Sequence, residues 1–214
     1  AELAIGLMLA VSRRIGENSL RAREEAPENL FGMGRSMGRS LRGQMLGLLG
    51  CGRIGKRTAE IAAAFGMRCI GYSRHGVNHP QVESVPLPEL LAQSDVLSLH
   101  CPLTQETHRL LDRSALARMK QGSILINTAR GAIVDCDALA DALESGHLRG
   151  AGLDVYPDEP HIPPRLIALP QVVLTPHIGT NTQETRQRMA EECARQIADA
   201  LAGKRPEHVV NGIE

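Results

Sequence analysis

Three side chains that could act on a small organic acid follow three separate apolar runs of the sequence. Arg130 lies in "INTARGAIVD" (126–135), Glu159 in "GLDVYPDEP" (152–160) and His177 in "TPHIGT" (175–180). The forked guanidinium of an arginine binds a carboxylate through two hydrogen bonds, and a histidine gives or takes a proton near neutral pH. A glutamate beside that histidine would favour the imidazolium and orient the ring. Together, these residue types could bind a carboxylate and move a proton on the molecule that carries it.

Each of the three residues also has an ordinary structural explanation. His177 could be a turn histidine bonded to backbone, and Arg130 a surface arginine. Glu159 could be a solvated loop residue, because prolines surround it at 157, 160, 163 and 164. The chemical interpretation therefore depends on a fold that brings the three together.

The chain from Met45 onward alternates short apolar runs with amphipathic segments, which is typical of a parallel sheet with crossover helices. We expect strands at 45–49, 67–72, 96–100, 123–127, 150–155 and 172–174, and helices near 53–65, 87–93, 112–119, 136–145 and 182–202. Asn181 with Glu184 resembles a capping box for the last helix. The predicted fold class is α/β, a doubly wound parallel sheet of the Rossmann type. Its carboxyl edge, where ligands bind, would hold Arg130, Glu159 and His177.

A glycine-rich turn gives the first indication of a cofactor. "GLLGCGRIG" supplies Gly50, Gly52 and Gly55 as G-x-G-x-x-G, directly after an apolar strand and before a helix. Glycine permits the tight turn, the close approach to a pyrophosphate and the packing of helix on strand. Arg53 and Ile54, inside the motif, are expected to contact the cofactor. On the helix that follows, Ile54, Ile61 and Phe65 are predicted to share a face.

The end of the second strand indicates which dinucleotide binds. An acidic residue here would bind the ribose hydroxyls of NAD, but the sequence has Ser73 and Arg74 after "MRCIGY". A hydroxyl and a guanidinium can bind a 2′-phosphate, which a carboxylate would repel. The sequence therefore favours NADP(H), with His75 as a helper. The alternative is that Arg74 is a solvated loop residue and that NAD binds.

Taken together, the ordered motifs resemble the D-isomer-specific 2-hydroxyacid dehydrogenase family. The resemblance runs from "AELAIGLMLAVSRR" through "GLLGCGRIG", "LHCPLTQETHRLLD", "INTARGAIVD" and "GLDVYPDEP" to "LTPHIGT". It implies that Arg130 holds the substrate carboxylate and carbonyl, that Glu159 partners the histidine, and that His177 is the acid or base. It also implies that Asp154 lies near the nicotinamide carboxamide. Further residues are expected to line the cofactor site, namely Cys101, Pro102, Thr107, Thr128 and Gly179.

The resemblance also implies a domain organisation. Family members carry, before the opening helix, a domain that closes over the substrate, and this sequence shows none of it. Residues 1–214 are then a dinucleotide-binding domain, with 1–28 as an interdomain or dimer helix and 203–214 as the start of the return to the absent domain. Leu3, Leu7 and Val11 would serve a homodimer through residues 1–25 or meet the absent domain. Such a chain would bind cofactor but turn over little, and its 2-oxo acid, from glyoxylate and hydroxypyruvate to longer acids, stays open.

The overall composition excludes several classes of partner. Twenty-four acidic and twenty-four basic residues give a formal net charge of zero, which predicts no attraction to nucleic acid or to an anionic membrane. The longest apolar stretch, 3–11, contains Gly6 and is too short for a bilayer. Five cysteines without disulfide or zinc spacing suggest a reduced, cytoplasmic setting, and "HGVNH" (75–79) lacks the third ligand of a metal site.

Two other functions fit parts of the same pattern. One is a dinucleotide-sensing interaction module like the C-terminal binding protein corepressors, which resemble the enzymes at these positions. The other is a relative of formate dehydrogenase, although that branch has a glutamine where this sequence has Glu159.

Overall fold

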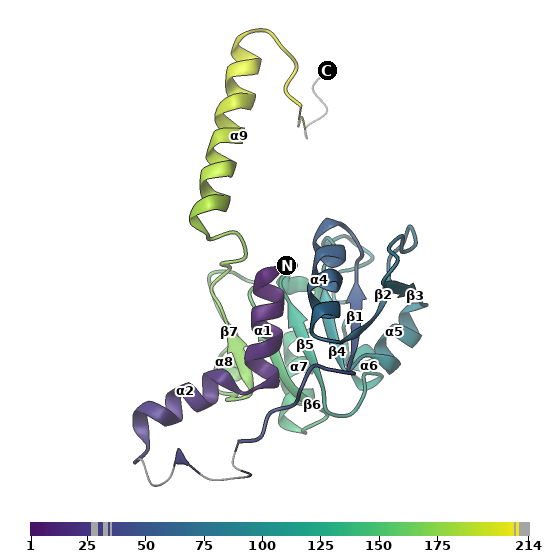
Figure 1. Ribbon diagram of the computed structural model, residues 1–214, viewed down its shortest axis with the longest axis vertical. Coiled ribbons are helices and arrows are strands. Elements are labelled where there is room, and N and C mark those ends of the chain that lie inside the picture. Colours follow the sequence, from purple (N-terminus) through teal and green to yellow (C-terminus); the bar gives the residue numbers. More distant parts are fainter. Residues whose placement is uncertain (27–29, 32–33, 35, 208, 210–214) are drawn as a thin grey trace. The chain divides into compact units, whose positions relative to one another are not determined.

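A seven-stranded parallel sheet forms the centre of the computed structural model, which describes residues 1–26, 30–31, 34, 36–207 and 209. Figure 1 shows the sheet with helices around it. Its order is β3-β2-β1-β4-β5-β6-β7, with every neighbouring pair parallel. The bounds are Met45–Leu49 for β1, Arg68–Tyr72 for β2, Val82–Ser84 for β3, Val96–Leu99 for β4, Ser123–Asn127 for β5, Leu148–Leu153 for β6 and Val172–Leu174 for β7. The predicted doubly wound sheet is confirmed, and β3 is an addition to it.

The helices cover both faces of the sheet. They are α4 (Arg53–Ala64), α5 (Leu87–Gln93), α6 (Arg113–Ala117), α7 (Cys136–Glu144) and α8 (Pro164–Ile167), with a short 3-10 helix, η1, at Gly131–Ile133. One apolar core joins the sheet to α5, α6 and α7 through residues such as Leu90, Leu116 and Leu139. A second core joins it to the opening helix and α4, through residues such as Met8 and Ala59. Every residue of β4 and β5 is buried, so the sheet fixes the position of the loops that follow its strands.

The expected opening helix is wrong in one respect, because it breaks into α1 (Glu2–Ser12) and α2 (Ile15–Glu24). The break falls at Arg14, which has a left-handed backbone with φ 53°. No residue of α2 is buried, whereas α1 lies on β5 and β6.

Leu7 and Val11 are already buried within this domain, without another domain or a second subunit. A Cβ added to Gly152 would lie 2.9 Å from Leu7 Cβ, and one added to Gly150 would lie 2.8 Å from Val11 Cγ1. The two glycines of β6 thus admit α1 at close range, and both side chains are buried in the domain's own core. The prediction that these two residues meet a partner or an absent domain is wrong.

The face of α4 that carries Ile54, Ile61 and Phe65 is not the one packed on the sheet. Ile54 is 55% exposed and Phe65 41% exposed, while Ile61 is only partly buried. The helix instead buries small residues, Gly55, Thr58, Ala59 and Ala62. Small side chains let α4 come close to β1, which leaves no room for the larger apolar residues on that side.

A second compact unit, Ile178–Glu214, contains α9 (Gln183–Leu201). The side chain of Thr182, rather than Asn181, caps this helix by accepting a hydrogen bond from the Thr185 N–H, so the predicted capping box is wrong by one residue. Of the predicted return segment 203–214, residues 208 and 210–214 lie outside the described part of the chain, as do residues 27 and 28 of the predicted interdomain helix. In the described segments, no helix combines the length and apolar character needed to cross a bilayer.

Candidate active site

The glycine-rich turn between β1 and α4 is shaped by close contacts at two of its three glycines. Gly50 has φ +99°, and a Cβ there would lie 2.6 Å from the Cys101 amide nitrogen. A Cβ on Gly55 would lie 2.3 Å from the Gly50 carbonyl oxygen. A Cβ on Gly52 would meet nothing within 4 Å. The first and third glycines are therefore needed by the fold itself, and the second opens onto space.

That space suits a dinucleotide pyrophosphate. Gly52 is the N-cap of α4 and supplies no side-chain cap, so the first N–H groups of the helix have no capping partner there. The helix N-terminus adds the positive end of its dipole. Arg53 and Ile54 are exposed beside it. The residues present thus fit the cofactor that the sequence predicts.

At the carboxyl end of β2 the structure leaves Arg74 weakly held. Its side chain is 68% exposed, and its nearest anion is the Glu106 carboxylate at 3.9 Å. Glu106 itself accepts a 2.6 Å hydrogen bond from the Thr104 hydroxyl. Ser73 is half-buried at the start of the same loop and His75 is exposed. The guanidinium is therefore available to an anionic ligand at this edge.

The loop after β4 uses one predicted cofactor residue to hold its own shape. The Thr107 hydroxyl accepts a hydrogen bond from the Thr104 N–H at 2.7 Å and donates one to the Pro102 carbonyl at 2.7 Å. Cys101, which precedes the loop, is half-buried, and burial raises the pKa of its thiol. Thr107 therefore closes the turn. The backbone at Cys101 lies close to Gly50.

Arg130 is carried by a turn that Asn127 organises. The Asn127 side chain is buried at the end of β5, accepts a hydrogen bond from the Ala129 N–H and donates one to the Arg130 carbonyl. Gly131 then passes so close to the next loop that a Cβ would lie 1.9 Å from the Tyr156 carbonyl carbon. The Arg130 side chain is exposed, and its Nη1 donates to the Ala129 carbonyl at 2.6 Å. Thr128, in the same turn, is half-buried.

The loops after β6 and β7 are joined by Asp154, Tyr156 and Thr175. Asp154 is 1% exposed, and one of its carboxylate oxygens accepts a 2.6 Å hydrogen bond from the Thr175 hydroxyl. The Tyr156 hydroxyl lies 2.9 Å from the Thr175 carbonyl oxygen and 3.2 Å from that of Leu153. Burial raises the pKa of Tyr156 to about 12, so the phenol stays protonated as a donor. These bonds fix the β6 loop relative to the end of β7.

Glu159 and His177 meet across those two loops. The Nδ1 atom of His177 lies 2.7 Å from one Glu159 carboxylate oxygen, and the other oxygen accepts a 3.0 Å hydrogen bond from the Tyr156 N–H. The hydrogen bond with His177 comes first among the causes that lower the pKa of Glu159, followed by the Tyr156 N–H, with a further contribution from the charge of Arg130. His177 itself has φ 53°. The geometry leaves the Nε2 side of a half-exposed ring facing away from the carboxylate, which is the arrangement that a proton donor or acceptor needs.

The predicted set therefore divides into three groups. Arg130, Glu159 and His177 lie at one edge of the sheet, and the glycine-rich turn with Arg74 lies at the same carboxyl edge. Asp154 is buried in a supporting network, and Gly179 belongs to the separately described unit 178–214. Asn127, Tyr156 and Thr175 are residues that sequence reasoning missed. Among the described residues, no group of three or more histidine, cysteine or acidic side chains could hold a metal ion.

Comparisons with known proteins match this architecture. The family model described as D-isomer specific 2-hydroxyacid dehydrogenase, NAD binding domain, matches residues 5–179. A glyoxylate reductase from Thermococcus litoralis is 43% identical over 220 residues, covering 99% of this chain and 66% of that protein. A D-3-phosphoglycerate dehydrogenase from Mycobacterium leprae is 41% identical over 217 residues, covering 99% of this chain and 40% of that protein.

A solved structure gives the same picture in three dimensions. An acyclic imino acid reductase in complex with NADPH and D-Arg has a TM-score of 0.87 at 33% identity, over 98% of this chain and 66% of that one. The chain thus spans at most about two thirds of these proteins.

Proposed function

Because the chain belongs to the D-isomer specific 2-hydroxyacid dehydrogenase family, we propose that it provides the cofactor site and the proton-transfer residues for hydride exchange between NADP(H) and a small 2-oxo acid. The observation that carries this proposal is the 2.7 Å pair of Glu159 and His177 at the edge where Arg130 also lies. A carboxylate, an imidazole and a guanidinium in that arrangement serve proton transfer to a carbonyl beside a bound carboxylate. The names of the two relatives, a glyoxylate reductase and a phosphoglycerate dehydrogenase, agree with a 2-oxo or 2-hydroxy acid.

In the proposed reaction, the bound nicotinamide supplies or accepts the hydride. His177 gives its Nε2 proton to the developing alkoxide during reduction and takes it back during oxidation. Glu159 holds and orients the ring through its contact with Nδ1. Arg130, whose exposed guanidinium donates a hydrogen bond to the Ala129 carbonyl of its own loop, binds the substrate carboxylate.

The preference for NADP(H) rests on the end of β2. Ser73 and Arg74 lie where a carboxylate would recognise the ribose of NAD, and the ion pair of Arg74 with Glu106 is long, at 3.9 Å. The solved imino acid reductase binds NADPH, which supports this cofactor for a chain of the same fold. A 2′-phosphate would replace a distant, exposed carboxylate as the partner of the guanidinium.

The first test is a calorimetric titration of the 214-residue chain with NADPH and with NADH. NADPH is expected to bind at least about tenfold more tightly, and Arg74→Ala is expected to remove that difference without weakening NADH. Arg118→Ala, which changes an exposed arginine in α6's C-cap, is the matched control and should change neither titration. Tighter binding of NADH would refute the NADP preference and leave the dehydrogenase proposal standing.

A second test addresses the proton carrier. His177→Ala is expected to abolish reduction of glyoxylate or hydroxypyruvate, followed by NADPH absorbance under conditions where the unchanged chain turns over, and to leave NADPH affinity within about twofold. Retained turnover would remove His177 from the mechanism. Because the chain spans at most about two thirds of these relatives, NADPH binding without turnover fits both roles, and capture of a protein partner is needed to favour the dinucleotide-sensing one.

The proposed assembly is a homodimer that uses α2. Ile15 is 52% exposed and Leu20 60% exposed on a helix that buries none of its residues, whereas Leu7 and Val11 are already covered. Leu20→Asp is expected to shift a dimer to monomer in sedimentation velocity, and Arg68→Asp, at the exposed start of β2, should not. A dimer unaffected by Leu20→Asp would exclude this part of α2.

A further inference from the structure

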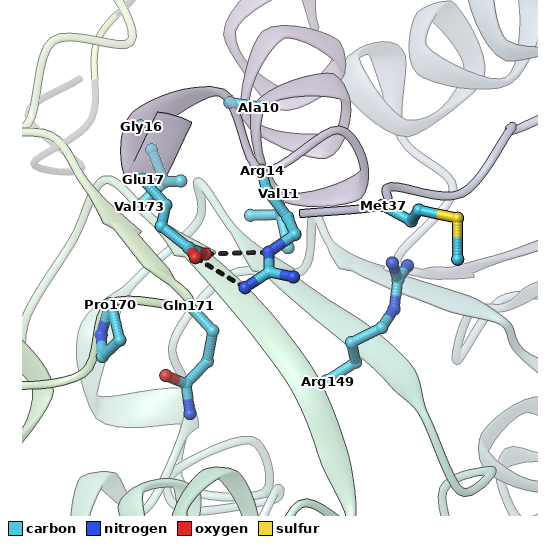
Figure 2. Close-up of a pocket in the computed structure, with 10 residues that line it drawn as sticks. All are labelled: Ala10, Val11, Arg14, Gly16, Glu17, Met37, Arg149, Pro170, Gln171 and Val173. Carbon is cyan, nitrogen blue, oxygen red and sulfur yellow. Dashed lines mark hydrogen bonds and ion pairs between the residues drawn. The ribbon is translucent and has the colours of Figure 1, made fainter. Parts of the chain in front are cut away.

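A small cavity lies at the amino ends of β6 and β7, at the opposite edge of the sheet from Glu159 and His177. Its volume is about 240 Å³. Figure 2 shows its lining, in which Ala10, Val11, Pro170 and Val173 form apolar walls around three charged side chains, Arg14, Glu17 and Arg149. Arg149 is the second residue of β6 and Asp154 directly follows the strand. At about 3.3 Å per residue, the two ends of β6 are roughly 17 Å apart.

Arg149 is the unusual member of this lining. Its Nε atom is buried and has no hydrogen-bond partner among the described residues, and no dashed line reaches its guanidinium in Figure 2. An unsatisfied buried donor of a charged group is costly, because water has been removed and nothing replaces it. Burial, followed by the positive charges of Arg39 and Arg14, lowers the pKa of the Arg149 guanidinium. The side chain therefore carries a charge that the surrounding protein does not balance.

The other two charges in the cavity balance each other. Arg14 donates from Nε and Nη2 to the two carboxylate oxygens of Glu17, at 2.8 and 2.6 Å. This bidentate pair is complete in itself, as Figure 2 shows, and it contributes little net charge. One carboxylate thus faces two guanidinium groups in the lining, which leaves about one positive charge uncompensated.

We propose that this cavity binds a compact oxyanion, a phosphate or a small carboxylate, with Arg149 as its principal ligand and Arg14 as the second cation. An oxyanion in the cavity would bind the terminal amino groups of the Arg149 guanidinium and offset the charge that Arg39 and Arg14 add. The volume sets the size class, since pockets for drug-sized ligands begin near 300 Å³, and a dinucleotide would not fit. The site is separate from the proposed cofactor site, because it lies at the other end of the strands.

Titration of the 214-residue chain with inorganic phosphate or acetate tests the proposal. Ionic strength is held constant with chloride, and the ¹⁵Nε–H signal of Arg149 is followed by NMR. Phosphate or acetate is expected to shift this signal to saturation, and the more tightly bound of the two identifies the kind of oxyanion. Arg149→Gln, followed through backbone amide signals of β6, should weaken binding by about tenfold or more. Glu17→Gln should tighten it by about threefold, because the competing carboxylate is gone.

Two control variants separate this cavity from other anion sites. Arg74→Gln and Arg118→Gln should leave binding at the Arg149 signal unchanged. If chloride reproduces the shift, or if Arg74→Gln abolishes oxyanion binding while Arg149→Gln does not, the proposal is wrong. Glu17→Gln keeps Arg149 in place, so unchanged or weaker binding in that variant would overturn the proposal even if Arg149→Gln did not fold.

Discussion

The two ends of β6 hold their charged groups in opposite ways. At the carboxyl end, the buried Asp154 accepts the Thr175 hydroxyl, and Glu159 is bonded to both His177 and the Tyr156 N–H. At the amino end, the half-buried Arg149 finds no partner for its Nε–H in the part of the chain that the structure describes. The loop after β6 thus holds the proposed proton-transfer group in place, whereas the start of the same strand carries an unbalanced charge. The difference indicates where the chain fixes its own side chains and where it has room for a ligand.

The largest effect on this comparison is expected from Gly131→Ala. Its Cβ would lie 1.9 Å from the Tyr156 carbonyl carbon, so the two loops at the carboxyl end would have to separate. We expect a loss of about 3 kcal/mol in the free energy of unfolding, measured in urea. Gly146→Ala is the control, because it has φ +73° but nothing within 4 Å, and should cost only about 1 kcal/mol. Equal costs would mean that the carboxyl end is not held by this close contact.

Thr175→Val should come next. It removes the hydroxyl that donates to Asp154 at 2.6 Å and leaves a 1% exposed carboxylate short of one donor. The expected loss is about 2 kcal/mol in the same unfolding measurement. Asp154→Asn in the same background tests the pair, because the cost of Thr175→Val should fall by about 1 kcal/mol when the charge is absent. Additive costs would show that the two residues are not coupled.

Arg149→Met should have a smaller effect and of the opposite sign. Replacing an unbalanced, half-buried charge by an apolar side chain of similar length is expected to leave the free energy of unfolding unchanged or to raise it by up to about 1 kcal/mol. The measurement is made without phosphate, so that no anion stabilises the parent chain. A loss of about 2 kcal/mol would reveal a partner for Arg149 and remove the contrast between the two ends.

The smallest effect concerns the titration of Glu159. Its pKa is lowered first by the hydrogen bond with His177 and then by the Tyr156 N–H, so its stabilising contribution is present above the ordinary value of 4.5 and is lost as the pH falls through the lowered pKa. In His177→Gln, the Glu159 pKa should rise towards its ordinary value. Carboxyl ¹³C NMR measures this directly, with Glu184 of α9's first turn as an internal reference. An unmoved titration would mean that the pair does not form in solution.

The parts of the site predicted from sequence follow from strand direction. Apolar runs located β1, β2, β4, β5, β6 and β7 to within two residues at each boundary, and parallel strands bring their carboxyl ends to one edge. This is why the meeting of Glu159 and His177 could be expected from residues eighteen positions apart. β3 was not expected, because two of its three residues are exposed and it lacks an apolar run.

The supporting contacts could not be predicted in the same way. Tyr156 and Thr175 act through backbone carbonyls and a carboxylate on another loop, and no sequence spacing encodes such bonds. Gly150 and Gly152 resemble ordinary weak strand residues until α1 is placed on them. On α4, the spacing showed that Ile54 and Phe65 share a face, but it did not show that the helix buries its alanines and a glycine against the sheet instead.

The position of α1 on β6 has a consequence for biosynthesis. Leu7 rests against Gly152, and α1 packs mainly on β5 and β6, which lie more than a hundred residues later in the chain. At translation rates of about 5–20 residues per second, several seconds pass between synthesis of this helix and synthesis of the β6 strand on which it packs. Among the helices of the sheet-containing unit, α1 is the first to be made and can be buried only after β6 has joined the sheet. A folding intermediate that lacks β6 therefore exposes Met8 and its neighbours, and is the form in which the growing chain would most need a chaperone.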